Sequence, residues 1–122
     1  MLKYSIILFG LLFFSCAKQR EWYVNTHVYN ATLEANTSLI TGTDTIPLRY
    51  VIIQLFESEY DRYQNQNSVA TNQTDENGYA PIFHLTGNYY YVKAHHYIYG
   101  EKYVQVATPD GEVSKVEIIF SE

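Results

Sequence analysis

The feature that most constrains the fold is a two-residue alternation of apolar and polar side chains, which begins at Trp22 and recurs through most of the chain. Successive residues of a β-strand point to opposite faces of a sheet, so this alternation is typical of strands with one buried face. No segment after Trp22 has the 3.6-residue apolar period of an amphipathic helix. The sequence therefore predicts an all-β domain.

Seven segments alternate in this way or are rich in β-branched and aromatic residues. The expected strands are residues 22–33, 48–56, 68–73, 79–85, 89–99, 102–107 and 114–120. Turn-forming residues separate most of them, at 41–44, 65–67, 75–78, 86–88 and 109–111. Short strands at these separations are typical of a β-sandwich, and we expect a single seven-stranded domain over residues 22–122.

The first fifteen residues differ from the rest of the chain. Lys3 is followed by an apolar run that ends at Ser15, which is the layout of a secretory signal. The run is too short for a transmembrane helix, which needs about 20 apolar residues. The only cysteine, Cys16, follows directly. A single cysteine cannot form an internal disulfide in an exported chain, so we expect its thiol to have another use.

Residues 12–16, LFFSC, resemble the lipobox of a bacterial lipoprotein signal, in which a small residue precedes a lipidated cysteine. The resemblance implies removal of residues 1–15 and membrane attachment through an acyl anchor, such as palmitate, on Cys16. Residues 16–21 would then be the lipidated N-terminus and a short tether. Ala17 stands where Gram-negative lipoproteins of the inner membrane have aspartate, so the resemblance implies the outer membrane, on its periplasmic or exposed side. The alternative is an ordinary signal with an unmodified thiol.

Residues 74–94, TDENGYAPIFHLTGNYYYVKA, combine a turn and two strands. Asp75 is placed to cap the turn with its carboxylate, and Gly78 to supply a positive φ. The stretch resembles carboxypeptidase regulatory-like and collagen-adhesin B-type domains, which are prealbumin-like, Ig-like β-sandwiches. The matching residues are Thr74, Asp75, Gly78, Ala80, Ile82, Leu85, Tyr90, Val92 and Ala94, with Pro47, Leu48, Val51, Ile53 and Leu55 upstream.

The same resemblance orients residues 89–99, YYYVKAHHYIY. If Val92 and Ala94 face the core, alternation places Tyr90, His96 and Ile98 on the same side. The opposite side is a candidate binding surface for a glycan or a protein, because tyrosine combines a flat apolar ring with a polar tip. Its residues are Tyr89, Tyr91, Lys93, His95, Tyr97 and Tyr99, extended by Tyr103. Cross-strand packing of tyrosines is the purely structural alternative.

Histidine placement argues against a metal centre. His95 and His96 point to opposite sides of a regular strand, so they cannot hold one ion together. The other two histidines, His27 and His84, stand at no spacing that is typical of a metal site. We therefore expect no metal and no cofactor, and interpret His96 as a hydrogen-bonded residue at the edge of the core.

Catalytic motifs are absent from the sequence, which has neither G-x-S-x-G nor H-E-x-x-H. We interpret Glu57, Glu59 and Asp61 as solvated loop charges, with a glycosidase pair or a cation site as alternatives. The resemblance implies two further tests. The first expected strand lacks the lysine, and the last the asparagine, of an adhesin-type isopeptide bond, and the ending IIFSE differs from the tyrosine-arginine-glycine-serine ending of transthyretin-like hydrolases. We expect a non-enzyme.

From Cys16 onward the chain has seven basic and thirteen acidic side chains, a net charge of about −6. No basic surface is expected that could hold phosphates, so nucleic acid is not an expected partner. The expected function is that of a lipid-anchored, non-catalytic binding or scaffolding accessory in a membrane-associated assembly of the cell envelope. A glycan-binding module that uses the tyrosines is the alternative, and a hydrolase comes third.

Overall fold

The computed structural model describes residues 30–122, which form eight strands and one short helix. In chain order these are β1 (Ala31–Thr41), β2 (Asp44–Pro47), β3 (Ile52–Phe56), α2 (Glu59–Gln64), β4 (Ala70–Gln73), β5 (Tyr79–Leu85), β6 (Tyr89–His96), β7 (Gly100–Ala107) and β8 (Val113–Ser121). The predicted signal, the lipidation site Cys16 and the tether lie outside the described residues. Within residues 30–122, no helix is long and apolar enough to cross a membrane.

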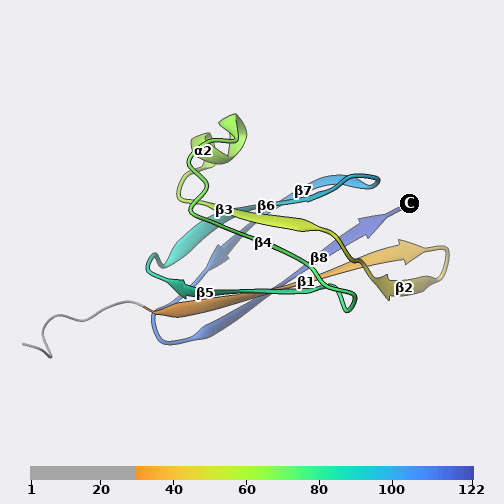
Figure 1. Ribbon diagram of the computed structural model, residues 1–122, viewed down its shortest axis with the longest axis horizontal. Helices are drawn as coiled ribbons and strands as arrows, with labels where there is room; N and C mark the ends of the chain where they lie inside the picture. Colours follow the sequence, from red (N-terminus) through yellow and green to blue (C-terminus); the bar gives the residue numbers. More distant parts are fainter. Residues whose placement is uncertain (1–29) are drawn as a thin grey trace, which may run out of the picture.

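The strands form two four-stranded sheets (Figure 1). In sheet A, β1 pairs in parallel with β8, while β5 and β2 pair antiparallel with its first and second halves. Sheet B has the antiparallel order β4-β3-β6-β7. Figure 1 shows α2 projecting beyond β3 and β6. The expectation of an all-β sandwich is confirmed, but with eight strands in place of seven.

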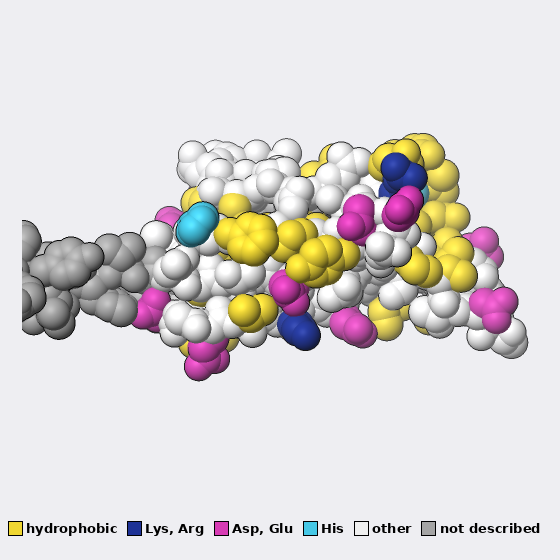
Figure 2. Space-filling model, turned by 60° about the horizontal axis from the view of Figure 1, so that its bottom comes forward, with side chains coloured by type: hydrophobic (Ala, Val, Ile, Leu, Met, Phe, Trp, Pro, Cys, Tyr) yellow, Lys and Arg dark blue, Asp and Glu magenta, His cyan; other side chains and the backbone are white. Residues whose placement is uncertain are grey.

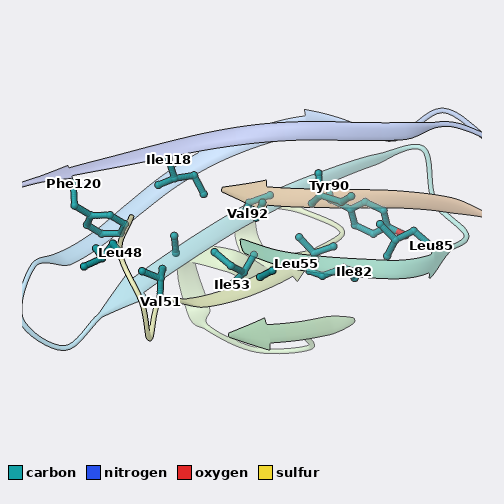
Figure 3. Close-up of a cluster of buried hydrophobic side chains, with 14 of the residues drawn as sticks. Leu48, Val51, Ile53, Leu55, Ile82, Leu85, Tyr90, Val92, Ile118 and Phe120 are labelled. Atoms are coloured by element: carbon teal, nitrogen blue, oxygen red, sulfur yellow. The ribbon is translucent and has the colours of Figure 1, made fainter. Parts of the chain in front are cut away.

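The core lies between the two sheets because alternate residues of each strand point inward. In Figure 3, side chains such as Leu55, Val92 and Ile82 fill the space between the layers. Val92 and Ala94 are fully buried, and Tyr90 and His96 lie on the same inner side, as predicted. Each buried aliphatic side chain stabilises the fold by about 1.5 to 3 kcal/mol.

The first strand differs from the prediction. Residues 22–29 of the expected strand 22–33 lie outside the described residues, and β1 continues well past Leu33 to Thr41. Its inward positions include Ala35 and Thr37, and these small or polar residues hide the alternation. The sequence pattern also does not predict β2, since all four of its residues are exposed.

The expected strand 48–56 and the polar loop after it also differ. Tyr50 has a positive φ of 69°, which bends the chain, so only Ile52–Phe56 is a strand. In place of the loop, Ser58 begins α2 by accepting a hydrogen bond from the Asp61 amide at 3.0 Å. Asn65 ends the helix in the left-handed conformation.

The turn between β4 and β5 packs tightly against β1. Asp75 Oδ1 accepts hydrogen bonds from the amides of Asn77 at 2.9 Å and Tyr79 at 3.0 Å. Gly78 has a φ of 73°, and a Cβ added there would lie 2.3 Å from the Thr37 carbonyl oxygen. Glycine is therefore required at this position for two reasons, its backbone conformation and its lack of a side chain.

Two threonines join the sheets beside this turn. Thr37 of β1 and Thr74 both donate hydrogen bonds from Oγ1 to the Leu48 carbonyl, at 2.7 and 3.0 Å. Thr74 Oγ1 also accepts from the Val51 amide at 2.9 Å. Both threonines are buried. We call Thr37, Leu48, Val51, Thr74 and Gly78 the threonine junction.

Candidate functional site

The outer face of sheet B brings polar and aromatic side chains from three strands side by side. Across β6 and β7, Lys93 lies opposite Tyr103 and His95 opposite Glu101. On the other side of β6, Gln54 of β3 lies opposite Lys93. Residues directly opposite in antiparallel strands have Cβ atoms about 5 Å apart, so these side chains are neighbours.

The helix α2 places the positively charged side chain of Arg62 on this face of sheet B. The Arg62 guanidinium donates hydrogen bonds to the carbonyls of Val92 at 3.3 Å and Val104 at 3.0 Å. Its Cζ lies 5.4 Å from the ring centre of Tyr91 and 5.1 Å from that of Tyr103. Only 11% of the Arg62 side chain is exposed. Arg62 is therefore fixed between two tyrosine rings, within the range of a cation–π interaction.

Phe56 ends β3 shortly before the helix begins. It pairs with Tyr91, an outward residue, and it is fully buried although it lies outside the main core cluster. α2 contacts β3 and β6 at this end of the sheet. Burial of a phenylalanine ring stabilises the fold by about 1.5 to 3 kcal/mol, and a six-residue helix such as α2 needs tertiary packing of this kind because it would not form alone.

Glu101 is the centre of an ionic cluster on the same face. Its carboxylate lies 3.6 Å from Lys93 Nζ and 3.5 Å from His95 Nδ1, and it accepts a hydrogen bond from the Tyr103 hydroxyl. That hydrogen bond, with the charges of Lys93 and His95, lowers the pKa of Glu101, and the same bond raises the pKa of Tyr103. At neutral pH the site therefore holds an ionised carboxylate and a protonated phenol.

Two hollows lie over this cluster. One, of about 400 Å³, is lined by Glu59, Arg62, Tyr63, Lys93, Glu101 and Tyr103. The other, of about 290 Å³, is lined by Ile52, Gln54, Asn65, Lys93, His95 and Glu101. Lys93 and Glu101 line both, so the two form one surface depression, which we call the α2 groove. It combines aromatic rings, amides and both signs of charge, a combination suited to hydrogen-bonding a ligand.

The predicted tyrosine surface divides in two. Lys93, His95 and Tyr103 line the α2 groove, and Tyr91 packs beneath Arg62. Tyr89, at the end of the strand, makes an edge contact with Tyr91 at 5.5 Å.

Tyr97 and Tyr99 do not continue that surface, contrary to the prediction. β6 ends at His96, whose Nδ1 accepts hydrogen bonds from the amides of Ile98 at 3.1 Å and Tyr99 at 3.4 Å, closing a turn. Alternation therefore stops. Tyr97 stacks on His96 and is 75% exposed, Tyr99 packs against the core, and Ile98, predicted to face inward, is 60% exposed.

Seven residues of the groove were not recognised in the sequence as binding residues: Glu59, Arg62, Tyr63, Glu101, Ile52, Gln54 and Asn65. The first three belong to α2, in the stretch interpreted as a polar loop. The available signal was Ser58 three positions before Asp61, with Asn65 four positions later, a pattern typical of helix start and end. Glu101 had no distinguishing local pattern.

His27 lies outside the described residues, and within residues 30–122 His84 and the acidic cluster belong to no group that could hold a metal ion. In the described part of the chain, no three His, Cys, Asp or Glu side chains are grouped so as to hold an ion. His84 Nδ1 lies 3.2 Å from Asn30 Oδ1, and neither residue lines the groove.

The outer face of sheet A is organised differently. Figure 2 looks onto the side that β1, β5 and β8 form, where hydrophobic side chains are interspersed with charged ones. Phe83, Val113 and Ile119 are exposed there. Glu34 accepts a hydrogen bond from the Tyr79 hydroxyl at 2.9 Å, which raises the pKa of Tyr79. Scattered apolar residues of this kind are normal on a protein surface.

Comparison with solved structures finds the same fold in other bacterial proteins. The chain is similar to a minor pilin of Streptococcus agalactiae, with a TM-score of 0.62 and 18% identity over 78% of this chain and 45% of the pilin. It is also similar to the Bacillus anthracis TIE protein, with a TM-score of 0.58 and 14% identity over 77% of this chain and 17% of the TIE protein. A third similar structure is a proposed carbohydrate-binding protein of Pseudomonas aeruginosa, with a TM-score of 0.53 and 12% identity over 75% of this chain and 89% of that protein.

These likenesses show a shared β-sandwich fold and, at such identities, nothing finer. The chain spans less than half of the pilin and less than a fifth of the TIE protein. No protein-family profile and no curated protein sequence matches the chain.

Proposed function

We propose that this chain is a lipid-anchored, non-catalytic binding protein of the bacterial cell envelope, and that the α2 groove is its binding surface. The groove carries the proposal, because it assembles residues from three strands and a helix around fixed cations. The fold's similarity to a pilin and to a proposed carbohydrate-binding protein supports a surface role. The LFFSC motif supports attachment through Cys16, and Ala17 in place of aspartate supports the outer membrane.

Within this proposal the domain is of the carboxypeptidase regulatory-like or collagen-adhesin B-type class. The sandwich fold and the Asp75–Gly78 turn support that assignment. β1 and β8 lie side by side, as the first and last strands of an isopeptide-forming domain would, but β1 has no lysine and β8 no asparagine. The chain would therefore be a member of the class without that crosslink.

The binding surface can be tested by photo-crosslinking in cells that export the full chain. A photoreactive phenylalanine analogue replaces Tyr63, which lines the groove, or Tyr60, which is exposed on the same helix and does not line it. We expect a specific envelope component to be captured from position 63 and not from position 60. Equal capture from both positions, or none from either, would contradict a binding role for the groove.

The anchor needs a separate test. Mass spectrometry of the mature chain should find an acylated Cys16 at its N-terminus, and Cys16→Ser should release the chain from the membrane fraction. An intact Met1 or an unmodified cysteine would refute lipid attachment while leaving the groove proposal in place.

A hydrolase is the competing class, since Glu59 and Glu101 line the same hollow. It predicts turnover of a captured ligand that is lost in Glu59→Gln or Glu101→Gln. We expect any ligand to be recovered unchanged after prolonged incubation with the full chain.

A further inference from the structure

We propose that the α2 groove selects a neutral oligosaccharide; this inference rests on the proposed function and names the ligand class of the same site. Three properties of the groove lead to it: paired charges, a tyrosine ring fixed in position, and side-chain amides beside the charged groups.

The charges of the groove are already paired. Arg62 lies 3.9 Å from Glu59, and Lys93 lies 3.6 Å from Glu101. One Arg62 nitrogen is further occupied by the Val92 and Val104 carbonyls. An anionic ligand would meet two carboxylates, and a cationic ligand would meet Arg62 and Lys93. Like charges in close contact cost several kcal/mol, so the groove favours a ligand without net charge.

Tyr103 is a fixed aromatic platform. Its ring packs near the Arg62 guanidinium, its hydroxyl is bound to Glu101, and 54% of the residue is still exposed. Tyr63 projects from α2 beside the same hollow and is 82% exposed. Sugar rings present apolar C–H faces that stack on such rings, and a ring held in place loses little entropy when it binds.

Polar side chains around the rings match the hydroxyls of a sugar. Gln54 and Asn65 provide amides that both donate and accept, and Glu101 provides a carboxylate acceptor. Lys93 Nζ contacts Asn65 Oδ1 at 3.4 Å and still has protons to donate. Sites that hydrogen-bond hydroxyls discriminate strongly against ligands that lack them. The two hollows adjoin at Lys93 and Glu101, which leaves room for more than one sugar ring.

The test is an array of neutral, uronic-acid and sulfated oligosaccharides, probed with the full chain purified in detergent. We expect binding to neutral members only. For the neutral oligosaccharide that binds best, Tyr63→Ala should weaken binding about fivefold to tenfold in calorimetry, because one stacking contact is lost. Tyr60→Ala, on the same helix and outside the groove, should leave binding unchanged.

Glu101→Gln sharpens the test. This substitution keeps the shape of the side chain but removes the negative charge that neutralises Lys93, so acidic oligosaccharides should begin to bind. Binding confined to acidic members by the unaltered chain, or an equal loss in Tyr60→Ala and Tyr63→Ala, overturns the inference.

The outcomes for the two proposals are distinct. If no oligosaccharide binds while position 63 captures a protein in cells, the ligand class is wrong and the binding role of the groove stands. If no oligosaccharide on the array binds and position 63 captures nothing, both proposals fail.

Discussion

The threonine junction and the α2 groove each join distant segments of the chain through side chains that donate to backbone carbonyls, but they differ in what remains accessible. In the junction, Thr37 and Thr74 share the Leu48 carbonyl, and both are buried. In the groove, Arg62 is similarly enclosed, yet Tyr63 and Glu101 beside it still meet solvent.

This difference in exposure indicates that the junction stabilises the fold, whereas the groove is available to bind a ligand. A buried polar group stabilises the native state only while its hydrogen bonds are made, so nearly any change at the junction leaves a group unpaired. At the groove, the hydrogen bonds of Arg62 hold the helix against the sheet, while Tyr63 and Glu101 beside it are exposed. Substitutions should therefore reduce stability most at the junction, and reduce binding without unfolding at the groove.

The largest effect on stability is expected for Gly78→Ala. The new Cβ would lie 2.3 Å from the Thr37 carbonyl oxygen at a φ of 73°, so both strain and overlap oppose it. We expect a loss of about 2 to 5 kcal/mol in urea unfolding. Gly42→Ala is the matched control, since Gly42 has a φ of 61° and nothing within 4 Å of the added atom. Equal losses in the two variants would show that the contact with β1 is unimportant.

Thr74→Val ranks second. The substitution keeps the side-chain shape, but it leaves the Val51 amide without its acceptor and the Leu48 carbonyl with one donor fewer. A loss of about 1 to 3 kcal/mol is expected, and Thr74→Ser should restore most of it. If the valine variant is as stable as the unaltered chain, the junction is not a stabilising element.

Most of the junction is accessible to sequence reasoning. Asp75 and Gly78 mark their turn through local chemistry, and the alternation around Val92 gives the inward side of β6. The hydrogen bonds of Thr37 are different, because they link β1 to the Leu48 carbonyl and depend on tertiary contact. A threonine at an inward position looks like a break in the pattern until its partner is known.

The groove is much less accessible to sequence reasoning. Alternation places Lys93 and His95 on the outer face, but it cannot show that Arg62 binds the Val92 and Val104 carbonyls of the same sheet, because those contacts span 30 and 42 residues. It also cannot show where a strand stops, and His96 ends β6 by binding the turn amides. Tyr97 and Tyr99 were misplaced for this reason.

Arg62→Met should have the third largest effect on stability. Methionine preserves much of the apolar stem but loses the hydrogen bonds to Val92 and Val104, so we expect about 1 to 2 kcal/mol of destabilisation. Arg49→Met is the control: Arg49 also stacks on a tyrosine, at 4.7 Å from the Tyr50 ring, but it is exposed, and the expected change is within about 0.5 kcal/mol. Similar losses in both variants would mean that ring stacking, and not carbonyl binding, fixes α2.

The smallest effect is expected from pH, through His96. Burial lowers the pKa of His96 below the ordinary 6.5; a hydrogen bond with the Arg49 backbone opposes this more weakly, and the charge of His95 adds the smallest contribution, which again lowers the pKa. The unfolded chain therefore binds a proton more readily than the native protein. Stability from this group is complete above pH 6.5 and declines as pH falls toward the native pKa.

Urea unfolding at pH 7.5, 6.5 and 5.5 should show this decline, and His96→Phe should reduce it because a ring remains but no longer titrates. His84→Asn, which removes an exposed histidine, should leave the decline unchanged. Glu101 titrates below this pH range, since its pKa is lowered from 4.5, so its own titration should not contribute. A decline that persists in His96→Phe and disappears in Glu101→Gln would assign the acid sensitivity to the groove and reverse the division between the two regions.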